Sequence, residues 1–83
     1  MENKNQWTNE NNSLVRIFTF NNFVEAVDFV NKIVPIAEKA KHHPDIEIFD
    51  YKNVKIKLTT HDKGSKVTEK DIELSKEIDK FLF

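Results

Sequence analysis

The feature that most constrains the fold is an alternation of apolar and polar residues over residues 54–60, VKIKLTT. A period of two is typical of a strand in an antiparallel sheet with one covered and one exposed face. Residues 46–51, IEIFDY, predict a second strand, joined to the first by a tight turn near Lys52-Asn53. We therefore expect a β-hairpin. In its second strand, the side chains that face the core are those of Val54, Ile56 and Leu58, and those that face solvent are Lys55, Lys57 and Thr59.

A helix is predicted ahead of this hairpin. Asn22 and Glu25 have the spacing of a capping box at its start, and Pro44 ends it. Pro35 falls inside the pattern and lacks a backbone N–H, which predicts a kink or a restart there. The apolar face of this helix is expected to comprise Phe23, Ala26, Val27, Val30, Ile33, Val34 and Ala37.

Two strands and a second helix complete the pattern. Residues 14–20, LVRIFTF, predict a strand, and Trp7 in a polar leader marks an anchored edge strand or a docking side chain. A second helix is expected to begin at Thr68, which forms a capping-box pair with Asp71. Its predicted apolar side is Ile72, Leu74, Ile78, Phe81 and Leu82.

This order of elements predicts an α+β fold: an antiparallel β-sheet of about four strands with two α-helices packed on one face. A length of 83 residues has room for a single domain, residues 1–83, of which residues 1–6 are expected to be flexible. A sheet this small leaves an edge to be covered, so we expect at least a homodimer.

Composition excludes several classes of function. The formal net charge is −1, which gives no electrostatic reason to bind nucleic acid or an anionic membrane. The chain has no cysteine, and so no thiol catalysis or cysteine-ligated zinc. No apolar run has the length of a membrane span, and the polar start is unlike a signal peptide. A cytoplasmic protein without membrane partners is expected.

All three histidines lie around the predicted hairpin, which raises three interpretations. His42 and His43 precede it and His61 follows it. Metal binding is disfavoured because adjacent side chains diverge and no HExxH motif is present. A solvated surface without function is the second interpretation. The third is proton transfer, because imidazole has a pKa near 6.5 and supplies both an acid and a base at neutral pH.

The neighbours of the histidines favour proton transfer. Glu38 lies four residues before His42, so on a continuing helix its carboxylate can hydrogen-bond that imidazole and fix its tautomer. Pro44 ends the helix and turns the histidine pair towards the sheet. By strand parity, His61 lies on the face that the helices do not cover.

These residues resemble the pterin-4a-carbinolamine dehydratases. The resemblance extends from Trp7 through most of the last helix. It rests on a composite of Glu38-x-x-x-His42-His43-Pro44, Tyr51, Thr60-His61, Gly64 and Asp71. It agrees with the fold expected above.

The resemblance implies a reaction, the loss of water from a 4a-hydroxytetrahydropterin to give a quinonoid dihydropterin, with neither metal nor cofactor. His42 and His61 would be the acid–base pair, His43 a substrate contact and a third candidate catalytic residue, and Asp71 an acidic residue near His61. Which histidine is the acid does not follow. The remaining residues of the implied site are Glu38, which would orient His42, and Pro44, Tyr51, Thr60 and Trp7.

The resemblance also implies a pathway and an alternative role. The pathway is tetrahydrobiopterin recycling, with a link to an aromatic amino-acid hydroxylase. The alternative is a partner-binding or transcription-coactivator module of the same fold. The apolar end of the chain, residues 81–83, would favour that alternative.

Overall fold

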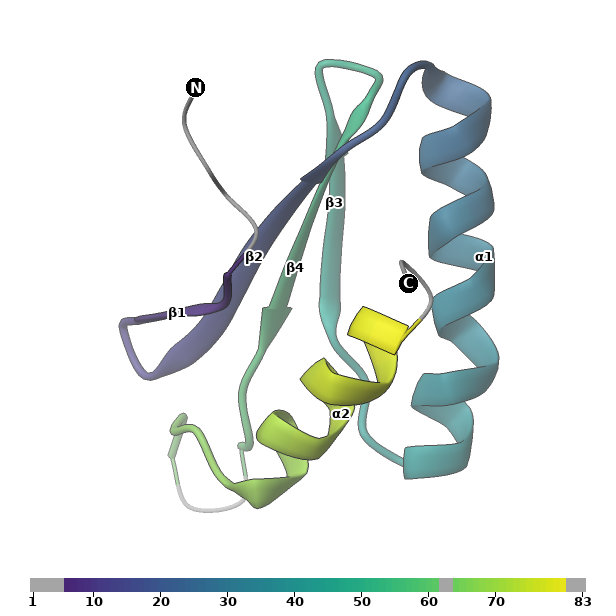
Figure 1. The fold of residues 1–83 in the computed structure, drawn as a ribbon. Coiled ribbons are helices and arrows are strands. Elements are labelled where there is room, and N and C mark those ends of the chain that lie inside the picture. Colours follow the sequence, from purple (N-terminus) through teal and green to yellow (C-terminus); the bar gives the residue numbers. More distant parts are fainter. Residues whose placement is uncertain (1–5, 62–63, 81–83) are drawn as a thin grey trace.

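Four antiparallel strands form one sheet, and two helices cover one of its faces (Figure 1). The computed structural model describes residues 6–61 and 64–80. The strands lie in the order β1-β2-β4-β3. The predicted α+β fold is confirmed. The elements are β1 (Thr8–Glu10), β2 (Ser13–Thr19), α1 (Phe23–Ala40), β3 (Asp45–Phe49), β4 (Asn53–Leu58) and α2 (Glu69–Lys80).

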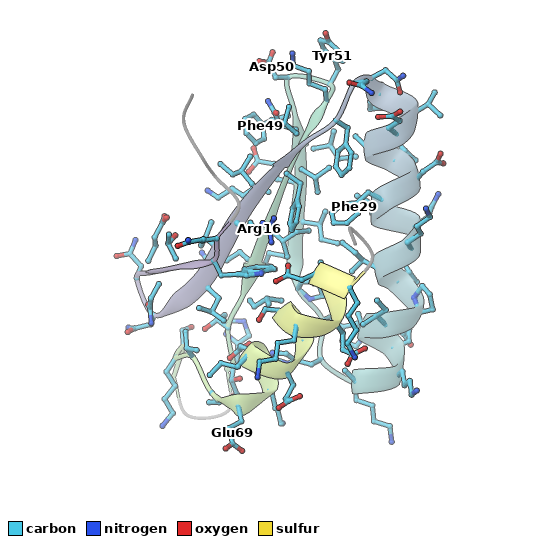
Figure 2. The ribbon with its side chains drawn as sticks, in the orientation of Figure 1. Arg16, Phe29, Phe49, Asp50, Tyr51 and Glu69 are labelled. Carbon is cyan, nitrogen blue, oxygen red and sulfur yellow. The ribbon has the colours of Figure 1, made fainter. Side chains whose placement is uncertain are left out.

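The core lies between the sheet and the two helices. The apolar side of β4 is fully buried, as its alternation predicted, and Phe18 of β2 lies opposite Val54 of β4. Phe29 of α1 packs against Phe18 with 4.7 Å between ring centroids (Figure 2). The buried cluster comprises Phe18, Ala26, Phe29, Ile33, Val54, Ile56, Leu58, Leu74 and Ile78.

The buried face of α1 differs from the predicted one. Phe23 and Val34, which were expected to be buried, are 53% and 52% exposed. Phe29, absent from the predicted face, is buried, and its ring contacts those of Phe18 and Phe20. The buried residues of the helix are Ala26, Phe29, Ile33 and Ala37.

The expected restart at Pro35 is wrong. A single helix runs from Phe23 to Ala40 with Pro35 inside it. Proline removes the hydrogen bond to the carbonyl four residues earlier, which here belongs to Asn31. Both Asn31 and Pro35 are exposed, so water can solvate that carbonyl.

The hairpin turn lies earlier than predicted. Asp50 and Tyr51 have φ values of 53° and 55°, and β3 ends at Phe49. Phe49 pairs with Asn53, so residues 50–52 form a three-residue connection between the two strands. Thr59, expected to face solvent, is buried because β4 ends at Leu58, and its hydroxyl donates to the carbonyl of Asn12 at 2.9 Å.

The start of α2 also departs from the prediction. Ile72 is exposed, and the charged Asp71 occupies the buried position beside it. The predicted contributions of Phe81 and Leu82 lie outside the described residues, as do most of the leader residues 1–6. Trp7 precedes the edge strand β1, as predicted. Neither α1 nor α2, within the described chain, is long and apolar enough to cross a membrane.

Candidate active site

The end of α1 directs His42 towards α2. Lys41 adopts a left-handed conformation with φ of 56°, and its N–H donates to the carbonyl of Glu38 at 3.2 Å. The N–H of His42 donates to the carbonyl of Ala37, also at 3.2 Å. This pair of bonds is a Schellman motif, which reverses the chain after a helix. The backbone of His42 is therefore fixed by the helix end itself.

The imidazole of His42 pairs with a buried carboxylate. Asp71, in the first turn of α2, has no exposed surface, and its Oδ1 lies 2.5 Å from Nε2 of His42. Its Oδ2 accepts hydrogen bonds from the backbone N–H of Thr68 and from the hydroxyl of Thr60, each at 2.9 Å. The bond from Thr68 confirms the predicted capping box.

Burial and hydrogen bonding act in opposite directions on the Asp71 carboxyl. Burial favours its neutral form and raises its pKa. The hydrogen bonds with His42, the Thr68 N–H and the Thr60 hydroxyl outweigh burial, so the pKa lies below its ordinary value of 3.8. Asp71 is therefore ionised at neutral pH and can only accept protons in hydrogen bonds.

The segment after β4 brings His61 to the same end of the molecule. Thr60, next to His61, forms an isolated β-bridge with Lys66 and is buried. His61 is exposed, and its Nδ1 lies 3.3 Å from the Ser65 hydroxyl oxygen. Thr60 also joins this segment to Asp71, so one carboxylate links the two chain segments that carry His42 and His61.

Glu38 and Asp71 contact histidines other than the ones predicted for them. Glu38 contacts His43, with 2.7 Å between Oε2 and Nε2, and both side chains are largely exposed. The expectation that Glu38 orients His42 is wrong, because the left-handed Lys41 turns His42 away from the helix surface. Asp71, expected near His61, contacts His42 instead. Pro44 is half-buried just before β3.

A groove opens beside His42. It has a volume of about 300 Å³ and lies between the end of α1 and the outer face of α2. Its lining is mostly apolar and includes Ala40, His42 and Leu74. The charged residues that line it are Glu69, Lys70, Glu73 and Glu77.

Two aromatic residues implied by the resemblance lie elsewhere in this chain. Tyr51 lies at the hairpin turn, at the opposite end of the molecule from Glu69, which begins α2 (Figure 2). Trp7 donates through Nε1 to the carboxylate of Asp79 at 3.0 Å. Asp79 lies eight residues after Asp71, about 12 Å further along the helix.

One member of the network was not anticipated as a site residue. The hydroxyl oxygen of Thr68 lies 2.7 Å from that of Thr60. The capping pattern predicted Thr68 as a helix-capping residue. Its hydroxyl contact with Thr60 could not be predicted, because contacts between two loops leave no periodic pattern in the sequence. Within residues 6–61 and 64–80, no group of three His, Asp or Glu side chains has an arrangement that could hold a metal ion.

Comparison with known sequences identifies the family. The model of the family described as Pterin 4 alpha carbinolamine dehydratase matches residues 1–81. The chain belongs to this family. Two of its relatives, both provisionally named pterin-4-alpha-carbinolamine dehydratase, match most of the chain. The Sulfolobus acidocaldarius protein is 51% identical, over a match that covers 89% of this chain and 79% of the length of that protein. The Picosynechococcus protein is 53% identical over 84% and 74%.

Solved structures of pterin dehydratase-like proteins share the fold. A transcriptional coactivator/pterin dehydratase from Brucella melitensis has a TM-score of 0.77 and 31% identity, covering 90% of this chain and 78% of its own. A pterin dehydratase-like protein identified as a RuBisCO assembly factor in the alpha-carboxysome has a TM-score of 0.71. That second protein is 21% identical, over 89% of this chain and 86% of its own, and supports the fold alone.

Proposed function

We propose that this protein is a hydro-lyase that dehydrates a 4a-hydroxytetrahydropterin to the quinonoid dihydropterin. Its proposed place is tetrahydrobiopterin recycling in the cytoplasm, downstream of an aromatic amino-acid hydroxylase. Membership of the pterin dehydratase family supports the class of reaction. The observation that carries the proposal is the pairing of His42 with the buried, ionised Asp71, next to the segment that bears His61.

The partners of His42 favour its role as the base. Ionised Asp71 accepts only, so the proton between the two side chains belongs to Nε2 of His42. A neutral His42 then carries its free lone pair on Nδ1. A carboxylate at Nε2 stabilises the imidazolium that forms when Nδ1 takes a proton, as in other carboxylate–histidine pairs. His42 is thus suited to remove the N5 proton of the pterin.

His61 is the proposed acid. Its described hydrogen-bond partner is a neutral hydroxyl, that of Ser65. Protonated His61 would give its proton to the departing C4a hydroxyl, which leaves as water with the C–O bonding electrons. The electrons of the N5–H bond then form the new double bond between N5 and C4a, so atoms and charge balance. His43, held by Glu38 at the surface, is the proposed substrate contact.

The groove beside His42 supports a substrate of this shape. Its volume of about 300 Å³ lies at the lower end of the range for small-molecule sites. A mostly apolar lining suits the flat faces of a bicyclic ring, and the neighbouring Glu69, Glu73 and Glu77 could accept from the amino and N–H donors of a pterin.

Rates of dehydration in single variants test the proposal. His42→Ala and His61→Ala should each lose about 10²–10⁴-fold in kcat, the usual contribution of a general acid or base. Thr59→Val is the matched control, because Thr59 is a buried threonine just after β4 whose hydroxyl donates to the carbonyls of Asn12 and Lys66 and not to Asp71. Folded histidine variants that dehydrate at the wild-type rate would contradict the proposal.

The second candidate is a partner-binding or coactivator module of the same fold. The Brucella melitensis protein, described as transcriptional coactivator/pterin dehydratase, favours it. A variant that lacks all three imidazoles would separate the two roles. Partner binding retained by that variant, with dehydration lost, would support a second function that is independent of the histidine site.

A further inference from the structure

Two hydroxyls behind Asp71, those of buried Thr60 and half-buried Thr68, take no part in the chemistry proposed above. The backbone N–H of Lys70 donates to the hydroxyl oxygen of Thr68 at 3.3 Å. The hydroxyls of Thr68 and Thr60 lie 2.7 Å apart, and Thr60 lies 2.9 Å from Oδ2 of Asp71. The chain of contacts therefore runs from the start of α2 to the partner of His42.

The direction of this chain follows from counting protons. A hydroxyl has a single proton to donate, and ionised Asp71 can only accept. The proton of Thr60 is therefore used on Asp71. The bond between the two threonines must then be donated by Thr68, which itself accepts from the Lys70 N–H. Every group along the path has one defined orientation.

We propose that Thr60 and Thr68 are positioning residues, which act as a one-way hydroxyl relay that fixes Asp71 and thereby the tautomer of His42. The two donors at Oδ2 hold the carboxylate plane so that Oδ1 faces the Nε2 proton of His42. The consequence for catalysis rests on the proposed dehydratase function. The consequence for His42 does not, because it can be measured without substrate.

A relay in series makes a different prediction from two independent contacts. Loss of the Thr60 hydroxyl removes a direct donor to Asp71, whereas loss of the Thr68 hydroxyl frees the Thr60 proton to rotate. Thr60→Val should therefore have the larger effect and Thr68→Val a smaller one in the same direction. The double variant should behave like Thr60→Val alone, since Thr68 acts through Thr60.

Nitrogen NMR of the imidazoles in the substrate-free protein tests the relay. In the wild type, neutral His42 should show the signature of the Nε2-protonated tautomer. In Thr60→Val, the other tautomer should become populated, and the carboxyl titration of Asp71 should move to higher pH. Thr60→Ser keeps the hydroxyl and should restore both signals, while Thr59→Val should change neither.

Activity separates the two claims. If both hold, Thr60→Val loses about tenfold in kcat with little change in KM, the cost of one charge-assisted hydrogen bond. Unchanged His42 tautomer and Asp71 titration in Thr60→Val would overturn the relay, whatever the activity. The expected NMR changes in a wild-type protein that does not dehydrate the pterin would support the relay and contradict the proposed function.

Discussion

At the scale of single residues, Asp71 has several roles. It caps α2 through the N–H of Thr68, ties the segment after β4 through Thr60, and pairs with His42. It does so as a fully buried charge at a helix N-terminus, where the helix dipole favours a negative group. A buried carboxylate with all its donors in place is costly to disturb, because each lost donor leaves the charge less compensated.

Substitution Asp71→Asn should make stability less dependent on acid pH. The folded state holds the pKa of Asp71 below its ordinary 3.8, so the unfolded state binds the proton more readily. The resulting stabilisation is fully present above about pH 4 and is lost as the pH falls through the lower folded value. Urea unfolding from neutral to acid pH should therefore show wild type and Asp71→Asn converging below about pH 4.

At neutral pH the same variant should be less stable than the wild type by about 2–4 kcal/mol, because an amide cannot satisfy all three donors. A gap between the two proteins that stays constant down to the acid limit would contradict the assigned pKa direction.

The contacts within the candidate site differ from those that the sequence predicted. Spacing and resemblance singled out His42, His43, His61, Glu38 and Asp71. The pairing was wrong, because it depends on the single left-handed residue Lys41, and lysine carries no signal for that conformation. The direction of one side chain thus decided which carboxylate reaches which histidine.

At the scale of elements, the end of α1 carries local strain at Lys41. Left-handed backbone is costly for residues with a Cβ, and glycine is favoured at this position of a Schellman motif. Lys41→Gly should therefore stabilise the protein by about 0.5–1 kcal/mol, since it relieves that conformation. Thermal unfolding should show a higher Tm.

Lys39→Gly is the matched control for this prediction. Lys39 lies two residues earlier, inside the last turn of the helix, where glycine costs about 1 kcal/mol. The two substitutions remove the same charge from nearly the same place and should change Tm in opposite directions. A lower Tm for both would argue against a left-handed Lys41.

Periodicity predicted the elements well, and irregular features less well. Strands β2, β3 and β4, the two helices and both helix starts follow from alternation, three-and-four spacing and capping residues, whereas only Trp7 pointed to β1. The turn at Asp50 and Tyr51 was misplaced because the aromatic Tyr51 extended the strand pattern to residue 51, although Asp50 tolerates left-handed backbone. The unbroken helix through Pro35 depends on solvent access, which local sequence does not reveal.

At the scale of the whole molecule, a buried cation links the two ends of the chain. Arg16 of β2 lies over the ring of Phe18, 4.4 Å from its centroid, and donates to Asp79 of α2 at 2.8 Å. Trp7 donates to the same carboxylate. Asp79 therefore joins the start of the chain and the middle of the sheet to the last helix (Figure 2 labels Arg16).

Asp79→Asn should destabilise the protein by about 2–4 kcal/mol, because it leaves the buried guanidinium of Arg16 without its anion. Glu77→Gln is the control on the same helix. Glu77 pairs with Lys80 at the surface, and such pairs contribute about 0–1 kcal/mol. Urea unfolding of the two variants should separate them clearly, and equal stability would contradict the importance of the buried pair.

The open edge of the sheet supports the prediction of a homodimer. In the described chain, β3 pairs with β4 on one side and forms the edge of the sheet. Ile46 and Ile48 of this strand are half-buried, and an edge of this kind offers backbone groups to a second copy. Light scattering at micromolar concentration should report at least a dimer. A monomer would contradict the prediction.

The central claim is that the histidine site catalyses dehydration of a pterin. Stopped-flow measurement of the decay of freshly generated 4a-hydroxytetrahydropterin, with and without the wild-type protein, tests it most directly. The account predicts a decay accelerated by the wild type, with the acceleration lost in His42→Ala. A folded wild-type protein that leaves the spontaneous rate unchanged would contradict it.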